Sequence, residues 1–366
     1  MEISSGGVDE QVDDLDEVNE VLPTTFSITS YGADYPVDGL VKRLGADDIV
    51  VPLYSRHADD QQETVGFQRE FVWSKSQADR FIESLLLGLP VPGVFFVKEA
   101  TGRHLVLDGQ QRLRTLQAFY EGIFQGKEFK LQNVQKQWIG KSYKTLAVDD
   151  RRRLDDSIIH ATIVRQDEPD DDQSSVYLIF ERLNSGGTFL QPQEIRVALY
   201  HGKLVELLSA LNDNLDWRAL YGKKSARLKD IELILRFFAM VFYSNQYRRP
   251  MKDFLNRYMA KNRDLQSQDG ELLKGVFDAT VSAILNGIGQ KAFRLTSAVN
   301  AAVLDAVMCG VAANLLSSSL CSRETMAVAY LALVKNETFL RATTRATADV
   351  DSVRERLDLA TKAFSA

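Results

Sequence analysis

A short polar motif, Asp-Gly-Gln-Gln-Arg, directly follows an apolar segment and combines side chains that suit phosphate chemistry. Residues 105–107 are Leu-Val-Leu, the motif occupies residues 108–112, and apolar residues then recur at helical spacing at Leu113, Leu116 and Tyr120. This pattern predicts a strand that turns sharply into a helix. Such a turn directs backbone N–H groups and the positive end of the helix dipole to one place, where an anion can bind.

Each side chain of the motif suggests a role at that place. Arg112 in the first helical turn can make a bidentate phosphate contact. Asp108 can hold a magnesium ion that is bound to a phosphate, or orient a water molecule. Gln110 or Gln111 can orient an attacking water, as glutamine does in other phosphoryl-transfer sites. The residues alone leave a second interpretation equally open, in which Asp108 caps the helix and Arg112 forms a surface ion pair.

Two more polar segments accompany the motif. Gln68 and Arg69 precede Trp73 and a predicted helix. They form either part of a site or a surface arginine that stacks on the tryptophan. Residues 184–187, Asn-Ser-Gly-Gly, follow a helical stretch. Because paired glycines form a sharp helix end, this segment either only terminates the helix or presents Asn184 on a polar loop.

These segments are carried by a mixed front part and a helical rear part. Apolar segments at 49–51, 94–97, 104–107 and 161–164 predict strands, and the pattern is helical from about residue 174 onward. The predicted fold class is therefore α+β. Its three parts are an acidic, largely disordered tail over residues 1–40, an α/β domain over 41–166 and an all-helical domain over 167–366.

The composition is that of an ordinary globular protein of 366 residues. Hydrophobic residues make up 45% and charged residues 26%, which excludes wholesale disorder, a collagen-like fibre and a disulfide-stapled miniprotein. The sequence shows no bilayer-spanning stretch and no signal peptide, and its two cysteines fit a reducing compartment. We therefore expect a cytoplasmic protein with no membrane partner.

The formal net charge of −6 hides an asymmetry. Residues 1–41 hold ten of the 50 acidic residues and no basic one, which leaves 40 acidic against 44 basic residues elsewhere. The acidic stretch is either a solvated tail or an arm that covers a basic site. Basic clusters in the remainder are candidate DNA-phosphate contacts or simply solvated helix faces. Their representative members are Arg151, Arg152, Lys223, Lys224, Arg248 and Arg249.

Taken in order, the segments resemble the domain-of-unknown-function 262 family, which includes the N-terminal domain of GmrSD-type modification-dependent restriction systems. The similar segments are 67–73 (Phe-Gln-Arg-Glu-Phe-Val-Trp), 86–92, 108–113, 180–187, 194–196 (Glu-Ile-Arg), 229–232 and 236–237. The resemblance implies a ParB/sulfiredoxin-like nucleotide-binding domain with a helical extension. It also implies binding, and commonly hydrolysis, of GTP or another NTP coupled to DNA restriction.

The family pattern also implies individual residue roles. By position, the nucleotide motif would be Asp108, Gly109, Gln110, Gln111 and Arg112, with Gln68 and Arg69 beside it and Asn184 and Arg196 contributed by the helical part.

Two residues depart from the pattern, and one feature of many relatives is not evident. Arg114 and Gln191 stand where the family leads us to expect Ser or Thr. Many relatives continue into a His-rich HNH nuclease domain, whereas the four histidines here show no metal-ligand spacing. We therefore assign no nuclease activity to this chain.

Three functions remain open, and one of them is a degenerate relative that is retained for assembly and has neither of the activities described next. In the first, the chain is a magnesium-dependent NTPase of a restriction or phage-defence system. In the second, it is a non-catalytic module that senses a nucleotide or modified DNA and regulates a separate partner nuclease. Assembly into a homo-oligomer is compatible with either.

Overall fold

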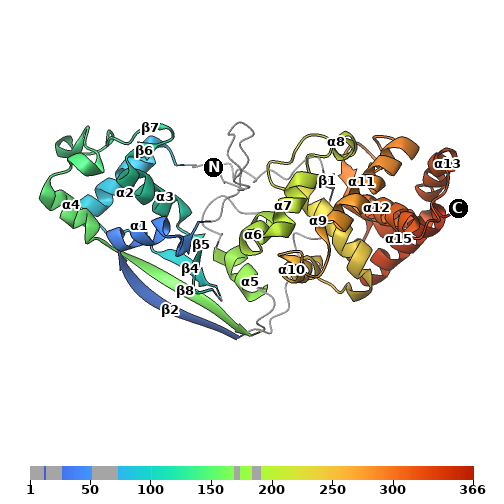
Figure 1. Ribbon diagram of the computed structural model, residues 1–366, viewed down its shortest axis with the longest axis horizontal. Helices are drawn as coiled ribbons and strands as arrows, with labels where there is room; N and C mark the ends of the chain where they lie inside the picture. Colours follow the sequence, from blue (N-terminus) through green and yellow to red (C-terminus); the bar gives the residue numbers. More distant parts are fainter. Residues whose placement is uncertain (1–11, 14–26, 52–72, 100, 169–173, 184–190) are drawn as a thin grey trace. The chain divides into compact units, whose positions relative to one another are not determined.

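The computed structural model describes residues 12–13, 27–51, 73–99, 101–168, 174–183 and 191–366 (Figure 1). The chain divides into two compact units, which we describe separately. The sheet unit spans Thr25–Asp170 and Ser175–Gly186. The helical unit comprises Gly187–Ala366 together with the short segments Met1–Thr24 and Asp171–Ser174. The predicted α+β class is confirmed.

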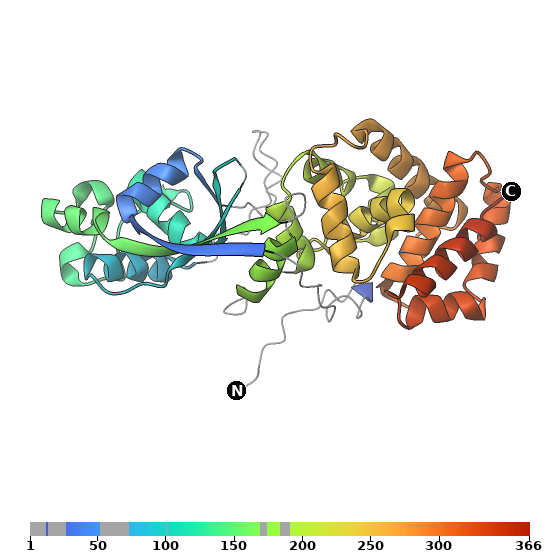
Figure 2. The ribbon, with the colours of Figure 1, turned by 90° about the horizontal axis from the view of Figure 1, so that it is seen from below.

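A five-stranded mixed sheet forms the centre of the sheet unit. Its strand order is β2-β8-β4-β5-β3, and β8 is antiparallel to β2 but parallel to β4. β5 is antiparallel to β4 and parallel to β3. Figure 2 shows the two longest strands, β2 and β8, lying side by side. The bounds are β2 Ser27–Pro36, β3 Ile49–Val50, β4 Val94–Lys98, β5 His104–Asp108 and β8 Ile158–Glu168.

β2 lies within the segment that the sequence assigned to a disordered tail. Its residues are mostly small or polar, so they lack the apolar alternation that marks a strand. The strand forms because it pairs along its length with β8, from Ser27 opposite Glu168 to Pro36 opposite Ile158. A long-range ladder therefore determines this element.

One face of the sheet packs against helices (Figure 1). Alternate strand residues such as Phe96, Val106 and Ile163 share a hydrophobic cluster with Leu85 and Leu116 from the helices. Ser74 caps α2 and forms a capping box with Gln77. The remaining elements of this unit are α1 Val37–Gly45, α2 Lys75–Leu86, α3 Gln110–Glu121, β6 Ile123–Phe124, β7 Lys127–Glu128, η1 Lys136–Trp138, η2 Tyr143–Thr145, α4 Val148–Asp155 and α5 Ser174–Leu183.

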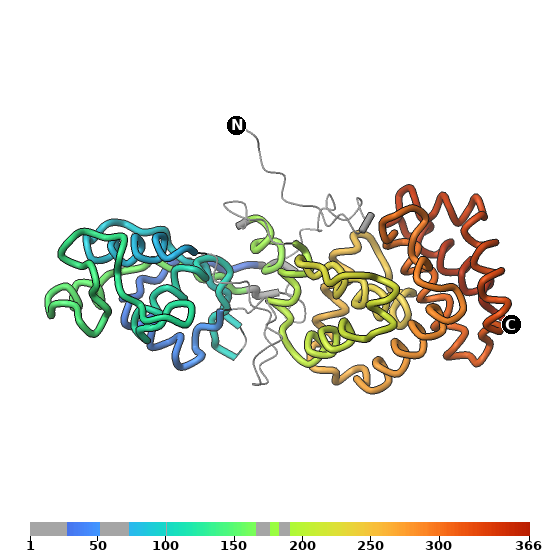
Figure 3. Tube along the Cα trace, turned by 90° about the horizontal axis from the view of Figure 1, so that it is seen from above, coloured from blue at the N-terminus to red at the C-terminus, as the bar shows by residue number. Residues whose placement is uncertain are grey.

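The helical unit is organised around α12, Ala301–Leu316, which packs against α9, α11 and α15. Its apolar run is buried on almost all sides, which explains why it has no polar face. A Cβ atom on Gly310 would lie 2.8 Å from the Ala360 backbone, so glycine permits the close approach of α15. Figure 3 traces the unit to its C-terminal helices.

The other described elements of this unit are helices and a small two-stranded sheet. They are β1 Val12–Asp13, which pairs with β9 Val299–Asn300, and α6 Pro192–Leu199, α7 Lys203–Leu211, α8 Leu215–Tyr221, α9 Lys229–Tyr243, η4 Ser244–Gln246, α10 Met251–Asn262, α11 Gly270–Gly287, α13 Arg323–Leu333, α14 Glu337–Thr344 and α15 Val350–Ala363. No helix in the described part of the chain has the length and apolar character needed to cross a membrane.

A buried ionic cluster crosses the centre of the helical unit. The Asp305 carboxylate of α12 is fully buried and accepts hydrogen bonds from Arg236 Nη2 at 2.7 Å and from Arg356 Nη2 at 3.0 Å. This one carboxylate is the ion-pair partner of both buried guanidinium groups. Its loss would therefore leave both positive charges uncompensated in the core.

We predict that Asp305→Asn lowers the free energy of unfolding of the helical unit by about 3–5 kcal/mol, the usual cost of breaking a buried ion pair. Urea unfolding followed by circular dichroism measures the loss. Asp358→Asn, an exposed change on α15, is the control and should stay within about 0.5 kcal/mol of wild type. Equal effects of the two substitutions would contradict the role assigned to the cluster.

Candidate functional site

The predicted strand-to-helix turn is present between β5 and α3. β5 ends at Asp108, and Gly109 is the N-cap residue with a left-handed backbone, φ 96° and ψ 9°. No side chain caps α3. In the second interpretation, the Asp108 cap is therefore wrong, because the chain turns one residue later, whereas the expected ion pair of Arg112 is present and is made with Asp108. The α3 N-terminus retains the positive end of the helix dipole.

Gly109 is required by both its backbone and its surroundings. A Cβ atom at this position would lie 2.4 Å from Val94 Cγ1 on the neighbouring strand β4. The left-handed conformation is itself costly for any residue with a side chain. The turn can therefore lie close against β4 only with glycine.

Arg112 links the start of α3 to the segment before β4. Its Nη2 donates to Asp108 Oδ2 at 2.7 Å, and its Nη1 donates to the backbone oxygens of Pro92 and, at 2.5 Å, Gly93. The arginine side chain is only 11% exposed, whereas that of Asp108 is 52% exposed. Arg112 thus fixes the junction from within, and the carboxylate faces solvent.

The glutamines of the motif lie half-buried in the first turn of α3. Gln111 Oε1 accepts a hydrogen bond from the Trp73 backbone N–H at 3.3 Å, which ties the start of α2 to α3. The Trp73 ring packs edge-on against Phe81 at 5.5 Å between centroids. Of the predicted nucleotide residues, Gln68, Arg69 and Asn184 lie outside the described residues.

Arg114, the departure from the family pattern, is half-buried on the side of α3 away from Arg112. Burial lowers the pKa of its guanidinium group. Among the residues that the structure describes, no acidic side chain pairs with it. It therefore adds positive charge to the motif helix.

Arg196 lies in the interior of the helical unit and is fully buried. Its Nη1 donates to Glu232 Oε2 at 2.9 Å and its Nε to Asn256 Oδ1 at 3.0 Å. Lys229 Nζ also donates to Glu232, at 2.5 Å. Sequence reasoning gave Glu232 and Asn256 no role, although charged residues at core-facing helical positions are a signal of such a network. These contacts account for Arg196 as a packing residue, and its nucleotide role stays a prediction.

The network strongly perturbs one carboxyl group. Burial by itself would raise the pKa of Glu232, but the neighbouring Lys229 and Arg196 cations outweigh burial and hold the pKa at about 2. Glu232 therefore remains ionised in the folded protein far below neutral pH.

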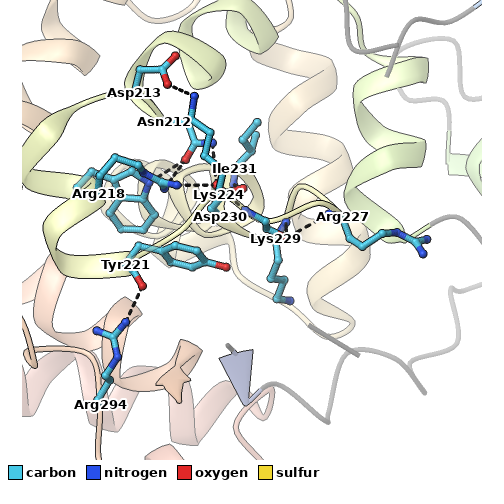
Figure 4. Close-up of polar contacts among 12 residues, drawn as sticks. Asn212, Asp213, Arg218, Tyr221, Lys224, Arg227, Lys229, Asp230, Ile231 and Arg294 are labelled. Carbon is cyan, nitrogen blue, oxygen red and sulfur yellow. Dashed lines mark hydrogen bonds and ion pairs between the residues drawn. The ribbon is translucent and has the colours of Figure 1, made fainter. Parts of the chain in front are cut away.

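Lys223 and Lys224 form a basic cluster in the loop before α9, and part of the positive charge in this region is paired with acidic side chains (Figure 4). Lys224 forms an ion pair with Asp213, and Arg218 Nη1 pairs with Asp230 Oδ2 at 3.0 Å. Lys223 is exposed in the same loop.

The other predicted DNA contacts also include both residues that are already engaged in polar contacts and exposed residues. Arg249 forms an ion pair with Asp349, Arg248 Nη1 donates to the Tyr247 backbone oxygen at 2.7 Å, and Arg151 and Arg152 lie on α4. Arg152 is exposed and Arg151 half-buried. The ion pairs favour a structural role for Lys224 and Arg249, and DNA contact by any of the six residues stays a prediction.

The histidines that the structure describes do not form a site. His104 is half-buried, and burial lowers its pKa. His160 Nδ1 lies 2.9 Å from Asp34 Oδ1 on the exposed β2–β8 ribbon. Within the described ranges, no three His, Cys, Asp or Glu side chains are grouped so as to hold a metal ion.

A comparison with known protein families finds a match over the region that contains the β5–α3 junction. Residues 58–201 match the family model described as the GmrSD restriction endonuclease, N-terminal domain. The match includes the motif at 108–112 and confirms the predicted resemblance over this segment. Among curated proteins, none matches the chain.

We predict that Gly109→Ala destabilises the sheet unit more than Gly102→Ala does. Both glycines have left-handed φ angles, but a Cβ atom on Gly102 would meet nothing within 4 Å. Gly102→Ala should cost about 1–2 kcal/mol from backbone strain alone, and Gly109→Ala roughly 1–3 kcal/mol more from the clash with Val94. Chemical unfolding of both variants measures the difference, and equal costs would show that the close approach to β4 is unimportant.

We predict that Glu232→Gln destabilises the helical unit by about 3–5 kcal/mol at neutral pH, because it leaves buried cations without their carboxylate. The folded-state pKa is depressed from 4.5 to about 2, so the stabilisation is complete above the unfolded value and lost as pH falls toward 2. The gap between wild type and variant should therefore narrow over this range in urea unfolding. Glu206→Gln, on the exposed side of α7, is the control; a pH-independent gap would contradict the assignment.

Proposed function

We propose that this chain, whose residues 58–201 are a GmrSD-type N-terminal domain, binds and hydrolyses a nucleoside triphosphate within a DNA restriction or phage-defence system. The observation that carries the proposal is the β5–α3 junction. There an uncapped helix N-terminus, an exposed carboxylate and a fixed guanidinium lie within five consecutive residues, 108–112. These are the components that a phosphate site needs.

The phosphates would bind at the first turn of α3, where backbone N–H groups and the helix dipole stabilise negative charge. The N–H groups of Arg112 already donate to Asp108, Pro92 and Gly93. Its proposed role is therefore to supply fixed positive charge and to hold Asp108 in place. Gln110 or Gln111, in the same turn, would orient the attacking water.

A magnesium ion fits this site as a companion of the nucleotide. Mg²⁺ is usually held by one or two carboxylates together with substrate phosphates and water. Asp108 offers one half-exposed carboxylate at the strand end and would be its protein ligand. When bound, the ion would neutralise charge on the phosphates.

The non-catalytic alternative is favoured by one contact. Asp108 Oδ2 is already engaged by Arg112 Nη2 at 2.7 Å. A carboxylate held in this way can stabilise the turn for nucleotide binding without acting on water. In that case the chain would be a sensor that regulates a separate nuclease.

DNA is the proposed macromolecular partner, because restriction systems act on DNA. Exposed basic residues, such as Arg152 on α4 and Lys223 in the α8–α9 loop, would contact its phosphates. Such contacts are sequence-independent and weaken as the salt concentration rises.

We predict that the purified chain releases phosphate from an NTP in the presence of Mg²⁺, and that Asp108→Asn reduces this rate by about 100-fold or more. The substitution keeps the shape of the side chain, so nucleotide binding measured by calorimetry should change much less. Arg103→Ala, an exposed change on the β4–β5 hairpin, should leave both quantities unaltered.

The outcomes separate the two functions. Nucleotide binding without turnover by wild type would select the sensor. Absence of binding to any NTP, with and without DNA, would refute the proposed site.

A further inference from the structure

A cavity of about 560 Å³ opens within the helical unit, between α9, η4, α12 and α15. Its volume lies in the range of small-molecule sites, roughly 300–1,000 Å³. Its lining combines apolar side chains, among them Met240, Ala313 and Val353, with the Cys309 thiol and with polar side chains of η4 and α15. All of its lining residues belong to a single compact unit.

Charged side chains also line this cavity. Arg248 and Arg354 contribute two positive charges, and Asp358 contributes one negative charge. All three are exposed. Arg354 makes only a distant ion pair, 3.6 Å from Asp351, so its guanidinium group can turn to a ligand at low cost.

The buried ionic cluster lies one helical turn behind the lining of this cavity. Arg236 precedes Met240 by one helical turn, and Asp305 precedes Cys309 by one turn. The cluster contains two arginines and one aspartate, all nearly inaccessible to solvent. At the Cys309 thiol, which lines the cavity, burial and the Asp305 carboxylate raise the pKa and outweigh the two arginines. The positive charge offered to a ligand therefore comes from Arg248 and Arg354, which line the cavity themselves.

We propose that this cavity binds a small amphipathic anion, that is, an apolar chain or ring system that carries one carboxylate, sulfonate or phosphate group. The apolar body would occupy the lining formed by α9, α12 and α15, where burial of apolar surface supplies affinity. The acidic group would lie toward Arg248 and Arg354, since guanidinium groups bind such oxyanions well. This site is separate from the β5–α3 junction and does not depend on the nucleotide proposal.

Calorimetry on the full chain with three probes tests the proposal. Sodium decanoate represents an aliphatic anion, naphthalene-2-sulfonate an aromatic anion, and decanol a neutral body of similar length. We expect saturable one-site binding of at least one anion. The anion that binds more tightly shows whether the cavity prefers an aliphatic chain or an aromatic ring system. Failure of both anions to bind, or decanol binding as tightly as decanoate, would overturn the proposal.

Two variants locate the binding. Arg354→Glu reverses a charge on an exposed side chain and should weaken anion binding by about tenfold, or about 1.4 kcal/mol. Arg345→Glu is the matched control, because Arg345 is exposed in the same unit but does not line the cavity. Equal weakening by both variants would overturn the assignment to this cavity. Ala313→Phe should fill the cavity and abolish binding.

Cys309 provides a readout that does not depend on a cavity-filling variant. In a Cys321→Ser background, Cys309 is the single thiol of the chain. Burial raises the pKa of this thiol, so alkylation by a small neutral reagent should be slow and should slow further when the anion is bound. An unchanged alkylation rate at saturating anion would place the ligand elsewhere and refute the proposal.

Discussion

The hydrogen bonds from Arg112 to the backbone of Pro92 and Gly93 are the constraint on which the junction depends. They fasten the first turn of α3 to the segment that enters β4, while the bond to Asp108 fastens the end of β5. A guanidinium group that is largely removed from water must have its N–H groups satisfied. Because glycine at position 109 lets the turn lie against Val94, the arginine can reach those carbonyls.

The helical unit is stabilised by a different kind of contact. Charges that would ordinarily face water are buried as a pair between Arg196 and Glu232 and as the cluster of Arg236, Asp305 and Arg356. Removing one partner of such a group is far more costly than the group's net contribution to folding. The charged residues of α9 therefore determine which elements pack against that helix. Apolar side chains alone would determine these packing partners less specifically.

Local features of the sequence were sufficient to predict the junction. An apolar strand, a glycine and helical spacing are contiguous in the chain, so the turn and the helix that follows it could be predicted from the pattern alone. The contacts of Arg112 could not be predicted, because Pro92 and Gly93 lie about 20 positions away and have no distinctive side chains. Arg196 shows the same limit, since Glu232 is 36 positions further along the chain.

The fixed position of Arg112 restricts how the proposed phosphate site can work. A mobile arginine enters a site late in the reaction, whereas Arg112 is already held by three hydrogen bonds, to two carbonyls and a carboxylate. Its charge is therefore in place before any ligand arrives, which is the condition for electrostatic stabilisation without reorganisation. Because the junction would contact only phosphates, selection among nucleotide bases must come from other residues. In the proposed function, the junction would supply affinity for the phosphates, and residues elsewhere would select the base.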